Sequence, residues 1–153
     1  QSVLPLKALQ DKFGVNKVVF TTYQSVSGSG QKGINDLENC LQGKKNEFYP
    51  YDISNTCIPE IDEFLDDGYT KEEMKMVNET RKILHKPDLK ITATTVRVPI
   101  TNSHSESINV EFENNFEMEE LIESLKEMTV LELNEDKLLH FSKADIAVFK
   151  LWN

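Results

Sequence analysis

The sequence predicts an α+β domain in which helices pack on one face of a mixed, largely antiparallel sheet. Segments 15–23, 91–100 and 107–112 are rich in β-branched and aromatic residues, and the last of them alternates apolar with polar side chains. Between them lie segments with apolar residues every three or four positions, the spacing of amphipathic helices. Their order is not a regular strand–helix repeat, which favours helices layered on a mixed sheet.

The amino-terminal elements are predicted from apolar spacing and glycine placement. Residues 4–13 predict a helix that ends at Gly14, with its apolar face on Leu6, Leu9 and Phe13. Strand 15–23 follows directly, and a turn of small residues at 24–30 opens into a second helix that ends at Gly43. The apolar face of that second helix carries Ile34, Leu37 and Leu41.

A third helix is marked by a capping signal. Thr70 and Glu73 have the spacing of a capping box, so we expect a helix from there to about Leu84. The preceding segment 53–61 is short, apolar and interrupted by Pro59, and it predicts no regular element. The connection between the second and third helices is therefore long.

The carboxyl-terminal half predicts strands and one more helix. Segments 91–100 and 107–112 are expected to form a hairpin-like pair, and 118–126 a helix that leads to a strand at 129–133. No internal repeat and no second domain is detected, so residues 1–153 are interpreted as one domain.

Composition excludes several classes of function. The chain has 153 residues, 39% of them hydrophobic, and a formal net charge of −9. Such acidity argues against a nucleic-acid partner, because displacing counterions from phosphates requires a concentrated positive surface. Two cysteines, Cys40 and Cys57, make neither a disulfide framework nor a metal site, so no metal is expected. No signal peptide and no membrane-length apolar run is present, so we expect no membrane partner and a cytoplasmic location.

Arg97 and His104 are the most informative functional residues. An arginine can bind a carboxylate with two parallel hydrogen bonds, and histidine exchanges protons near neutral pH. The alternation of residues 94–100 puts Thr95 and Arg97 on the face opposite Val96, so Arg97 is not required to be buried. The alternatives are an ordinary surface arginine and an exposed histidine in a polar loop.

The turn at 24–30 and two charged residues of the third helix are further candidates. Turn glycines before a helix let a ligand approach the backbone, although serine and glycine in a row most often form only a loop. Glu72 and Lys75 share one helix face at i, i+3 spacing, which by itself indicates an ordinary ion pair.

Four motifs, in order, resemble the carboxyl-terminal catalytic and dimerisation domain of bacterial aspartate-semialdehyde dehydrogenases. TYQSVSGSG at 22–30 is similar to the family's TYQAVSGAG, and IPEID at 58–62 to IPQID. GYTKEEMKM at 68–76 resembles YTxEEMKM, and VRVPITNSHSES at 96–107 resembles VRVPVxxHSES. The match covers residues 1 to about 133. It implies a fold like the carboxyl-terminal domain of glyceraldehyde-phosphate dehydrogenase.

The resemblance implies the reduction of aspartyl phosphate to the semialdehyde, or its reverse, through a cysteine thioester with NADP as the cofactor. Such a site needs a thiolate, a base, clamps for carboxylate and phosphate, and a nicotinamide face. The implied roles are substrate orientation by Gln24, cofactor contact by Ser27 and Gly28, amine binding by Glu72, phosphate binding by Lys75, carboxylate binding by Arg97, and acid–base catalysis by His104. The implied setting is lysine, threonine and methionine biosynthesis by a homodimer.

The resemblance also implies what this chain lacks. The family's nucleophilic cysteine precedes a segment like 1–7, and most of the NADP surface belongs to an amino-terminal half, so we expect the isolated chain to be inactive. Cys40 and Cys57 are interpreted as small buried side chains. The alternative is a non-catalytic dimerisation module derived from the family.

Residues 134–153 are interpreted as a divergent tail, since they match no part of the family pattern. A truncated or frame-shifted ending is the alternative. The apolar residues of 146–152 are placed to cover a sheet edge. Of the other histidines, His140 carries no motif, and His85 is expected at a helix end, where its charge suits the helix dipole.

Overall fold

The computed structural model describes residues 2–127 and 146–152 of the chain. Its elements, in chain order, are α1 (Val3–Phe13), β1 (Val15–Gln24), the short 3₁₀ helix η1 (Val26–Ser29), α2 (Gln31–Leu41), α3 (Lys71–Ile83), β2 (Lys90–Arg97), β3 (His104–Phe112), α4 (Met118–Lys126) and β4 (Ile146–Trp152). The expected strand at 129–133 and His140 lie outside the described residues.

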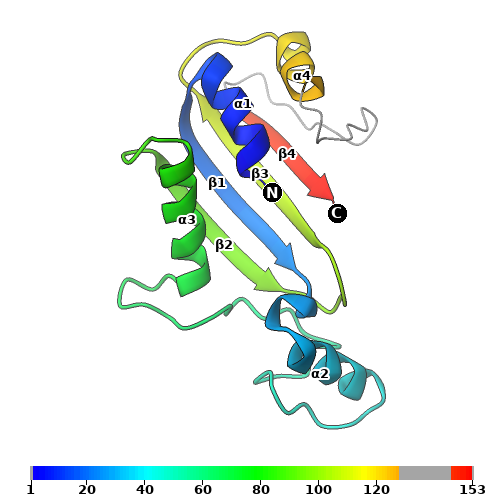
Figure 1. The fold of residues 1–153 in the computed structure, drawn as a ribbon. Helices are drawn as coiled ribbons and strands as arrows, with labels where there is room; N and C mark the ends of the chain where they lie inside the picture. The colour runs from blue at the N-terminus through cyan, green and yellow to red at the C-terminus, as the bar shows by residue number, and fades with distance from the viewer. Residues whose placement is uncertain (1, 128–145, 153) are drawn as a thin grey trace.

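The strands form one mixed sheet in the order β2-β1-β3-β4 (Figure 1). The central pairing of β1 with β2 is parallel, whereas β3 runs antiparallel to both β1 and β4. The predicted mixed and largely antiparallel sheet is therefore confirmed. The parallel pair requires a long crossover, which runs through α2 and α3.

Helices α1, α3 and α4 lie over the same face of the sheet (Figure 1). Apolar residues of α1 and α4 pack with alternate strand residues into the main core, whose fully buried members include Leu6, Leu9, Val18, Phe20, Ile108, Val110 and Leu121. Because side chains alternate along a strand, the other face of β1 carries Val19, Thr21 and the 44% exposed Tyr23. No helix of residues 2–127 lies over that second face (Figure 1).

The first helix begins and ends close to the predicted limits. Leu6, Leu9 and Phe13 are buried, as their spacing requires. Gly14 follows with a φ of 69°, in the left-handed region that glycine adopts without strain, and its N–H donates to the carbonyl of Gln10 at 3.1 Å. The chain therefore turns directly from α1 into β1.

Helix α2 lies beyond the end of the sheet rather than over its face (Figure 1). It packs with the following connection into a second cluster made of Val26, Leu37, Cys40, Tyr49, Ile53 and Ile58. The buried carboxylate of Asp36 accepts hydrogen bonds from the amides of Glu47, Phe48 and Tyr49, which fixes this connection against α2. Leu41, predicted on the apolar face, is 70% exposed because α2 ends there and nothing packs over it.

The predicted capping box of α3 is present. The Thr70 hydroxyl accepts from the amide of Glu73, and the Glu73 carboxylate accepts from the amide of Thr70. The other Glu73 oxygen accepts from the amide of Thr95 at 3.1 Å, so the same side chain ties α3 to β2. His85 lies just past the helix end, as expected, with a φ of 54°.

The prediction that the second and third strands form a hairpin-like pair is wrong. β2 and β3 are not neighbours, because β1 lies between them and pairs with both. Residues 98–103 cross over the end of β1 instead, where the carbonyls of Ile100 and Thr101 accept from the amides of Val26 and Ser27. Three strand ends and η1 therefore meet at one place.

The backbone of β4 pairs with β3 from Ser105 to Glu111. The position predicted for 146–152 at a sheet edge is thus confirmed for the backbone, and β4 is itself the outer strand. Among the residues that the structure describes, no helix is long and apolar enough to cross a bilayer.

Candidate functional site

The register of the sheet aligns three of the predicted residues in one row. Gln24, the last residue of β1, pairs with Arg97 at the end of β2 and with His104 at the start of β3. Paired residues present their side chains on the same face, here the face that α1 and α3 cover. An amide, a guanidinium and an imidazole therefore lie side by side where three strands end.

Arg97 is buried, contrary to the expectation that it need not be. Only 5% of the residue is exposed, because the covered face of β2 carries Ala93, Thr95 and Arg97 whereas Thr94 faces solvent. Its Nη1 donates to the carbonyl of Ser25 at 2.7 Å and lies 3.5 Å from the Gln24 Oε1. Burial lowers the pKa of Arg97, and the charge of Glu72 acts in the opposite direction. A guanidinium retains its charge in proteins, so the row contains a buried cation.

His104 begins β3 rather than lying in a loop. The amide of Ser25 donates to the Nδ1 atom of His104 at 3.2 Å, and the Ser25 hydroxyl lies at the same distance from that atom. A backbone N–H can only donate, so Nδ1 acts here as an acceptor and the neutral ring carries its proton on Nε2. Ser25, the residue just before η1, therefore holds the imidazole in place. Sequence reasoning did not single out this serine.

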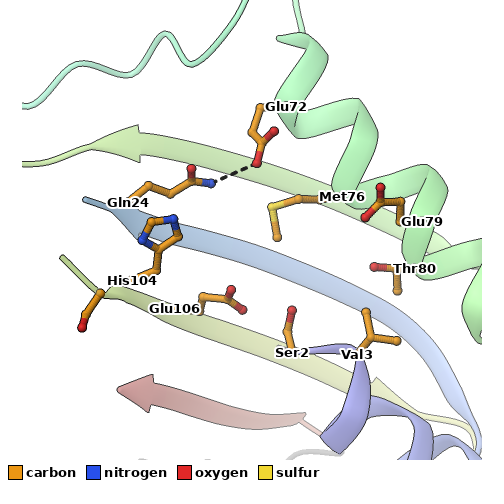
Figure 2. Close-up of a pocket in the computed structure, with 10 residues that line it drawn as sticks. Ser2, Val3, Gln24, Glu72, Met76, Glu79, Thr80, His104 and Glu106 are labelled. Atoms are coloured by element: carbon orange, nitrogen blue, oxygen red, sulfur yellow. Dashed lines mark hydrogen bonds between the residues drawn. The ribbon is translucent and has the colours of Figure 1, made fainter. Parts of the chain in front are cut away.

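Gln24 connects the row to α3. Its Nε2 lies 3.3 Å from the Thr22 hydroxyl and 3.4 Å from a Glu72 carboxylate oxygen, a contact drawn in Figure 2. Glu72 also pairs with Lys75 at 3.5 Å, where the Lys75 side chain is 58% exposed. Both predicted α3 residues therefore lie at the site, Glu72 pointing toward Gln24 and Lys75 at its solvent side.

A cavity of about 460 Å³ opens between α3, the start of α1 and the covered face of β1 and β3 (Figure 2). Of the predicted residues, Gln24, Glu72 and His104 line it, whereas Arg97, Lys75, Ser27 and Gly28 do not. Its remaining lining residues are Ser2, Val3, Met76, Glu79, Thr80, Ser103 and Glu106.

The cavity is acidic. Three carboxylates line it, those of Glu72, Glu79 and Glu106, and its only basic lining residue is His104. One oxygen of Glu106 is buried without a hydrogen-bond partner. Glu106 was missed by sequence reasoning, although it lies two residues after His104 and strand alternation puts both on one face. The lining can hold an ammonium group beside a proton-transferring imidazole.

Ser27 and Gly28 lie in η1 and do not line the cavity. A Cβ atom added at Gly28 would lie 2.8 Å from the Arg97 Nη1, so only glycine lets the turn approach the guanidinium this closely. Gly28 is exposed and Ser27 is half-buried. The turn thus offers an accessible backbone surface backed by a cation.

Neither cysteine lines the cavity. Cys40 is buried in the second cluster, as expected, and burial together with a hydrogen bond to Asp52 raises the pKa of its thiol. Cys57 is exposed, so its interpretation as a buried side chain is wrong. It lies in the irregular connection next to Ile58, whose side chain is buried instead. No group of three metal-ligating side chains is found among the described residues.

Comparison with known proteins identifies the class of domain that this fold and site define. Residues 6–145 match the family model of the semialdehyde dehydrogenase dimerisation domain, and the chain belongs to that family.

The named proteins to which this chain is similar include several aspartate-semialdehyde dehydrogenases. The enzyme of Aquifex aeolicus is 47% identical over 133 residues, which are 82% of this chain and 39% of that protein. The structure of aspartate semialdehyde dehydrogenase II from Vibrio cholerae complexed with ASA superposes with a TM-score of 0.79 at 40% identity, covering 84% of this chain and 40% of that one. The Candida albicans enzyme with NADP gives 0.57 at 28% identity, over 82% and 32% of the two chains. The chain therefore spans about 40% of the length of its curated relatives.

Proposed function

We propose that this chain is the substrate-binding and dimerisation part of an aspartate-semialdehyde dehydrogenase that uses NADP. The observation that carries the proposal is the row Arg97–Gln24–His104, which three strand ends align beside an acidic cavity. An α-amino acid aldehyde carries a carboxylate, an ammonium and a reactive carbonyl, and the site offers a group for each.

Each group of the substrate has a chemical counterpart. The buried guanidinium of Arg97 is the carboxylate clamp, and Glu72, which lines the cavity, is the acceptor for the ammonium. Gln24, which contacts both of these residues, orients the substrate between them. Lys75, the exposed partner of Glu72 on α3, supplies the positive charge for phosphate. His104 transfers protons at the reacting carbonyl.

The residues present fit a nicotinamide cofactor at η1. Gly28 is exposed and has no side chain, so a planar ring can approach the backbone, and the Ser27 hydroxyl lies beside it. When bound, the cofactor supplies the hydride chemistry. Ser27 and Gly28 cover only a small surface, so most of its affinity has to come from another part of the protein.

The isolated chain is proposed to be inactive, because the thioester chemistry needs a thiolate within reach of His104. Cys40 is buried among apolar residues of the second cluster. Cys57 is exposed in the long connection, next to Ile58, whose backbone bridges to Arg97 of β2. Neither is at the cavity. The proposed setting is amino-acid biosynthesis in the cytoplasm.

The test joins this chain to a nucleotide-binding half that supplies a cysteine. Phosphate-dependent reduction of NADP by aspartate semialdehyde is expected, and the same protein with His104→Ala should lose at least 100-fold in rate, the scale of general acid–base catalysis. A well-folded joined protein with no such activity would overturn the proposal.

Dimerisation is proposed through the uncovered face of the sheet, where Tyr23 is 44% exposed and none of the helices that the structure describes packs. Thr94 lies on that face and is exposed, so Thr94→Arg places a charge there without disturbing the core. Sedimentation should show a dimer for the unaltered chain and a monomer for the variant.

A non-catalytic dimerisation module is the second candidate, and the same uncovered face favours it. Arg97→Ala separates the two readings, with calorimetric titration of aspartate as the probe. Binding that is lost in this variant, with the dimer retained, supports a working substrate site. If the unaltered chain binds no aspartate but still dimerises, the module is favoured.

A further inference from the structure

Ser25 forms hydrogen bonds with both ionisable members of the row, Arg97 and His104. It is fully buried between β1 and η1. Its amide and its hydroxyl both lie 3.2 Å from the His104 Nδ1, and its carbonyl accepts from the Arg97 Nη1 at 2.7 Å. Every polar group of Ser25 is therefore directed at a residue of the site.

The two contacts with Nδ1 make opposite demands on His104. The Ser25 amide can only donate, so it favours the neutral ring that has a lone pair on Nδ1 and its proton on Nε2. A ring that accepts a proton at Nε2 must already carry one on Nδ1, and the charged ring carries both. In those two states the Nδ1 proton faces the Ser25 amide and needs another acceptor.

The Ser25 hydroxyl is that acceptor. A hydroxyl rotates and can donate or accept, unlike the amide. It lies 2.9 Å from the Ser27 hydroxyl, which can take the Ser25 proton when the Ser25 oxygen accepts from Nδ1. The hydrogen bond from Arg97 holds the Ser25 backbone in place while the hydroxyl turns.

We propose that Ser25 is a positioning residue for proton transfer. Its hydroxyl, hydrogen bonded to Ser27, accepts a hydrogen bond from the Nδ1–H of His104 while the Nε2 of the same ring exchanges a proton with a ligand. The inference rests on the acid–base role given to His104 in the proposed function. The Nδ1 proton stays on the ring, and only the hydroxyl protons of Ser25 and Ser27 rotate. Ser25 itself touches His104 and not the substrate.

Other charged groups around His104 are common to all the variants needed for a test. Three carboxylates line the same cavity, those of Glu72 and Glu79 from α3 and of Glu106 from β3. The guanidinium of Arg97 in β2 lies 3.5 Å from the Gln24 Oε1. At the start of α1, Ser2 and Val3 line the cavity, and neither side chain is charged. A change confined to Ser25 therefore leaves these charges in place.

The experiment is a pH titration of the 153-residue chain labelled with nitrogen-15 in its three histidines. The imidazole signals report the proton on each ring nitrogen directly, and His85 and His140 serve as internal references. In Ser25→Ala the charged ring loses its acceptor and keeps only the opposing amide. The midpoint of the His104 titration should fall by about half to one pH unit, because a hydrogen bond to a charged group is stronger than one to a neutral group.

Ser29→Ala is the matched control, since it removes a hydroxyl of the same turn that accepts from the Tyr49 hydroxyl at 2.9 Å and does not reach His104. Its His104 midpoint should equal that of the unaltered chain. Ser27→Ala, which removes the relay partner, should shift the midpoint in the same direction as Ser25→Ala but by less.

An unchanged His104 midpoint in both Ser25→Ala and Ser27→Ala would overturn the proposal, as would an equal shift in the Ser29→Ala control. The titration reads the imidazole and not turnover. A negative result here thus leaves the dehydrogenase proposal standing, and failure of the joined enzyme leaves a shifted midpoint to be explained by Ser25 alone.

Discussion

Arg97 shows how a single residue can be both a ligand group and part of the packing. The guanidinium is held by the Ser25 carbonyl on one side and approached by the backbone of Gly28 on the other. Within residues 2–127 no carboxylate is hydrogen bonded to this guanidinium, so most of its donors are left for a ligand. A position of this kind is sensitive to small changes in the turn that faces it.

Gly28→Ala tests this sensitivity without touching the guanidinium. The new Cβ would lie 2.8 Å from the Arg97 Nη1, and the flexible end of the arginine has to move away. We expect roughly tenfold weaker binding of aspartate, the loss of about one charged hydrogen bond, measured by calorimetric titration. The thermal midpoint should change little, because the contact is with a side-chain end and not with backbone. Unaltered affinity would argue against Arg97 as the clamp.

Asp52 provides a pH-dependent contribution to stability that lies away from the site. Its carboxylate accepts from the amide and hydroxyl of Ser54 and from Asn55, and these hydrogen bonds lower the pKa of Asp52 from 3.8 to about 2. The folded pKa lies below the unfolded one, so the contribution is fully present above pH 3.8 and is lost as the pH falls toward 2.

The measurement compares urea unfolding of the unaltered chain and of Asp52→Asn at pH 5 and at pH 2.5. The unaltered chain should be the more stable at pH 5, and the difference between the two proteins should shrink at the lower pH. Effects of acid on other groups are common to both proteins and cancel. A difference that is the same at both values would contradict the assignment.

At the scale of elements, the site depends on how α3 is anchored. Its first turn carries the capping box of Thr70 and Glu73, and Glu73 also holds the amide of Thr95 in β2. Glu72 lies between these two anchoring residues in the sequence and lines the cavity. The cap therefore sets the position of the proposed amine-binding carboxylate as well as the start of the helix.

Thr70→Ala should lower the free energy of unfolding by about 1 kcal/mol, the usual cost of losing a helix cap, as measured by urea denaturation. Thr101→Ala, which changes an exposed threonine of the 98–103 crossing, should stay within about 0.5 kcal/mol of the unaltered chain. Equal losses in the two variants would mean that the capping box does not stabilise α3.

At the scale of the whole molecule, two clusters share the burial of apolar surface. The main one joins α1 and α4 to the sheet, and the second joins α2 to its connection. The site lies where they meet, since Ser25 precedes η1 and Val26 belongs to the second cluster. A stable sheet thus supports one wall of the site and a smaller cluster supports the turn.

Leu9 and Leu41 are matched helix leucines that differ in burial, 0% against 70% exposed. Leu9→Ala should lower the free energy of unfolding by about 2–5 kcal/mol, because it leaves a cavity in the main core. Leu41→Ala should have an effect within about 0.5 kcal/mol. Thermal or urea unfolding followed by circular dichroism distinguishes them, and comparable losses would place Leu41 in a contact that the described residues do not show.

The sequence by itself determined the local elements and the types of group at the site. Helical spacing, the capping box of Thr70 and the glycine after Phe13 act within a few residues, so the limits of α1, α3 and α4 follow from them. The motif resemblance points to Gln24, Glu72, Arg97 and His104 as site residues without any coordinates. These signals are local or shared with relatives, and they survive without knowledge of the fold.

Only the tertiary structure decided that β1 lies between β2 and β3, and with it the row that brings an amide, a guanidinium and an imidazole together. Strand order depends on hydrogen bonds between segments about 70–100 residues apart, which no local pattern encodes. The burial of Arg97 and the contact of Ser25 with His104 follow from that order. A strand's alternation gives two faces, but which one is covered depends on where the helices pack.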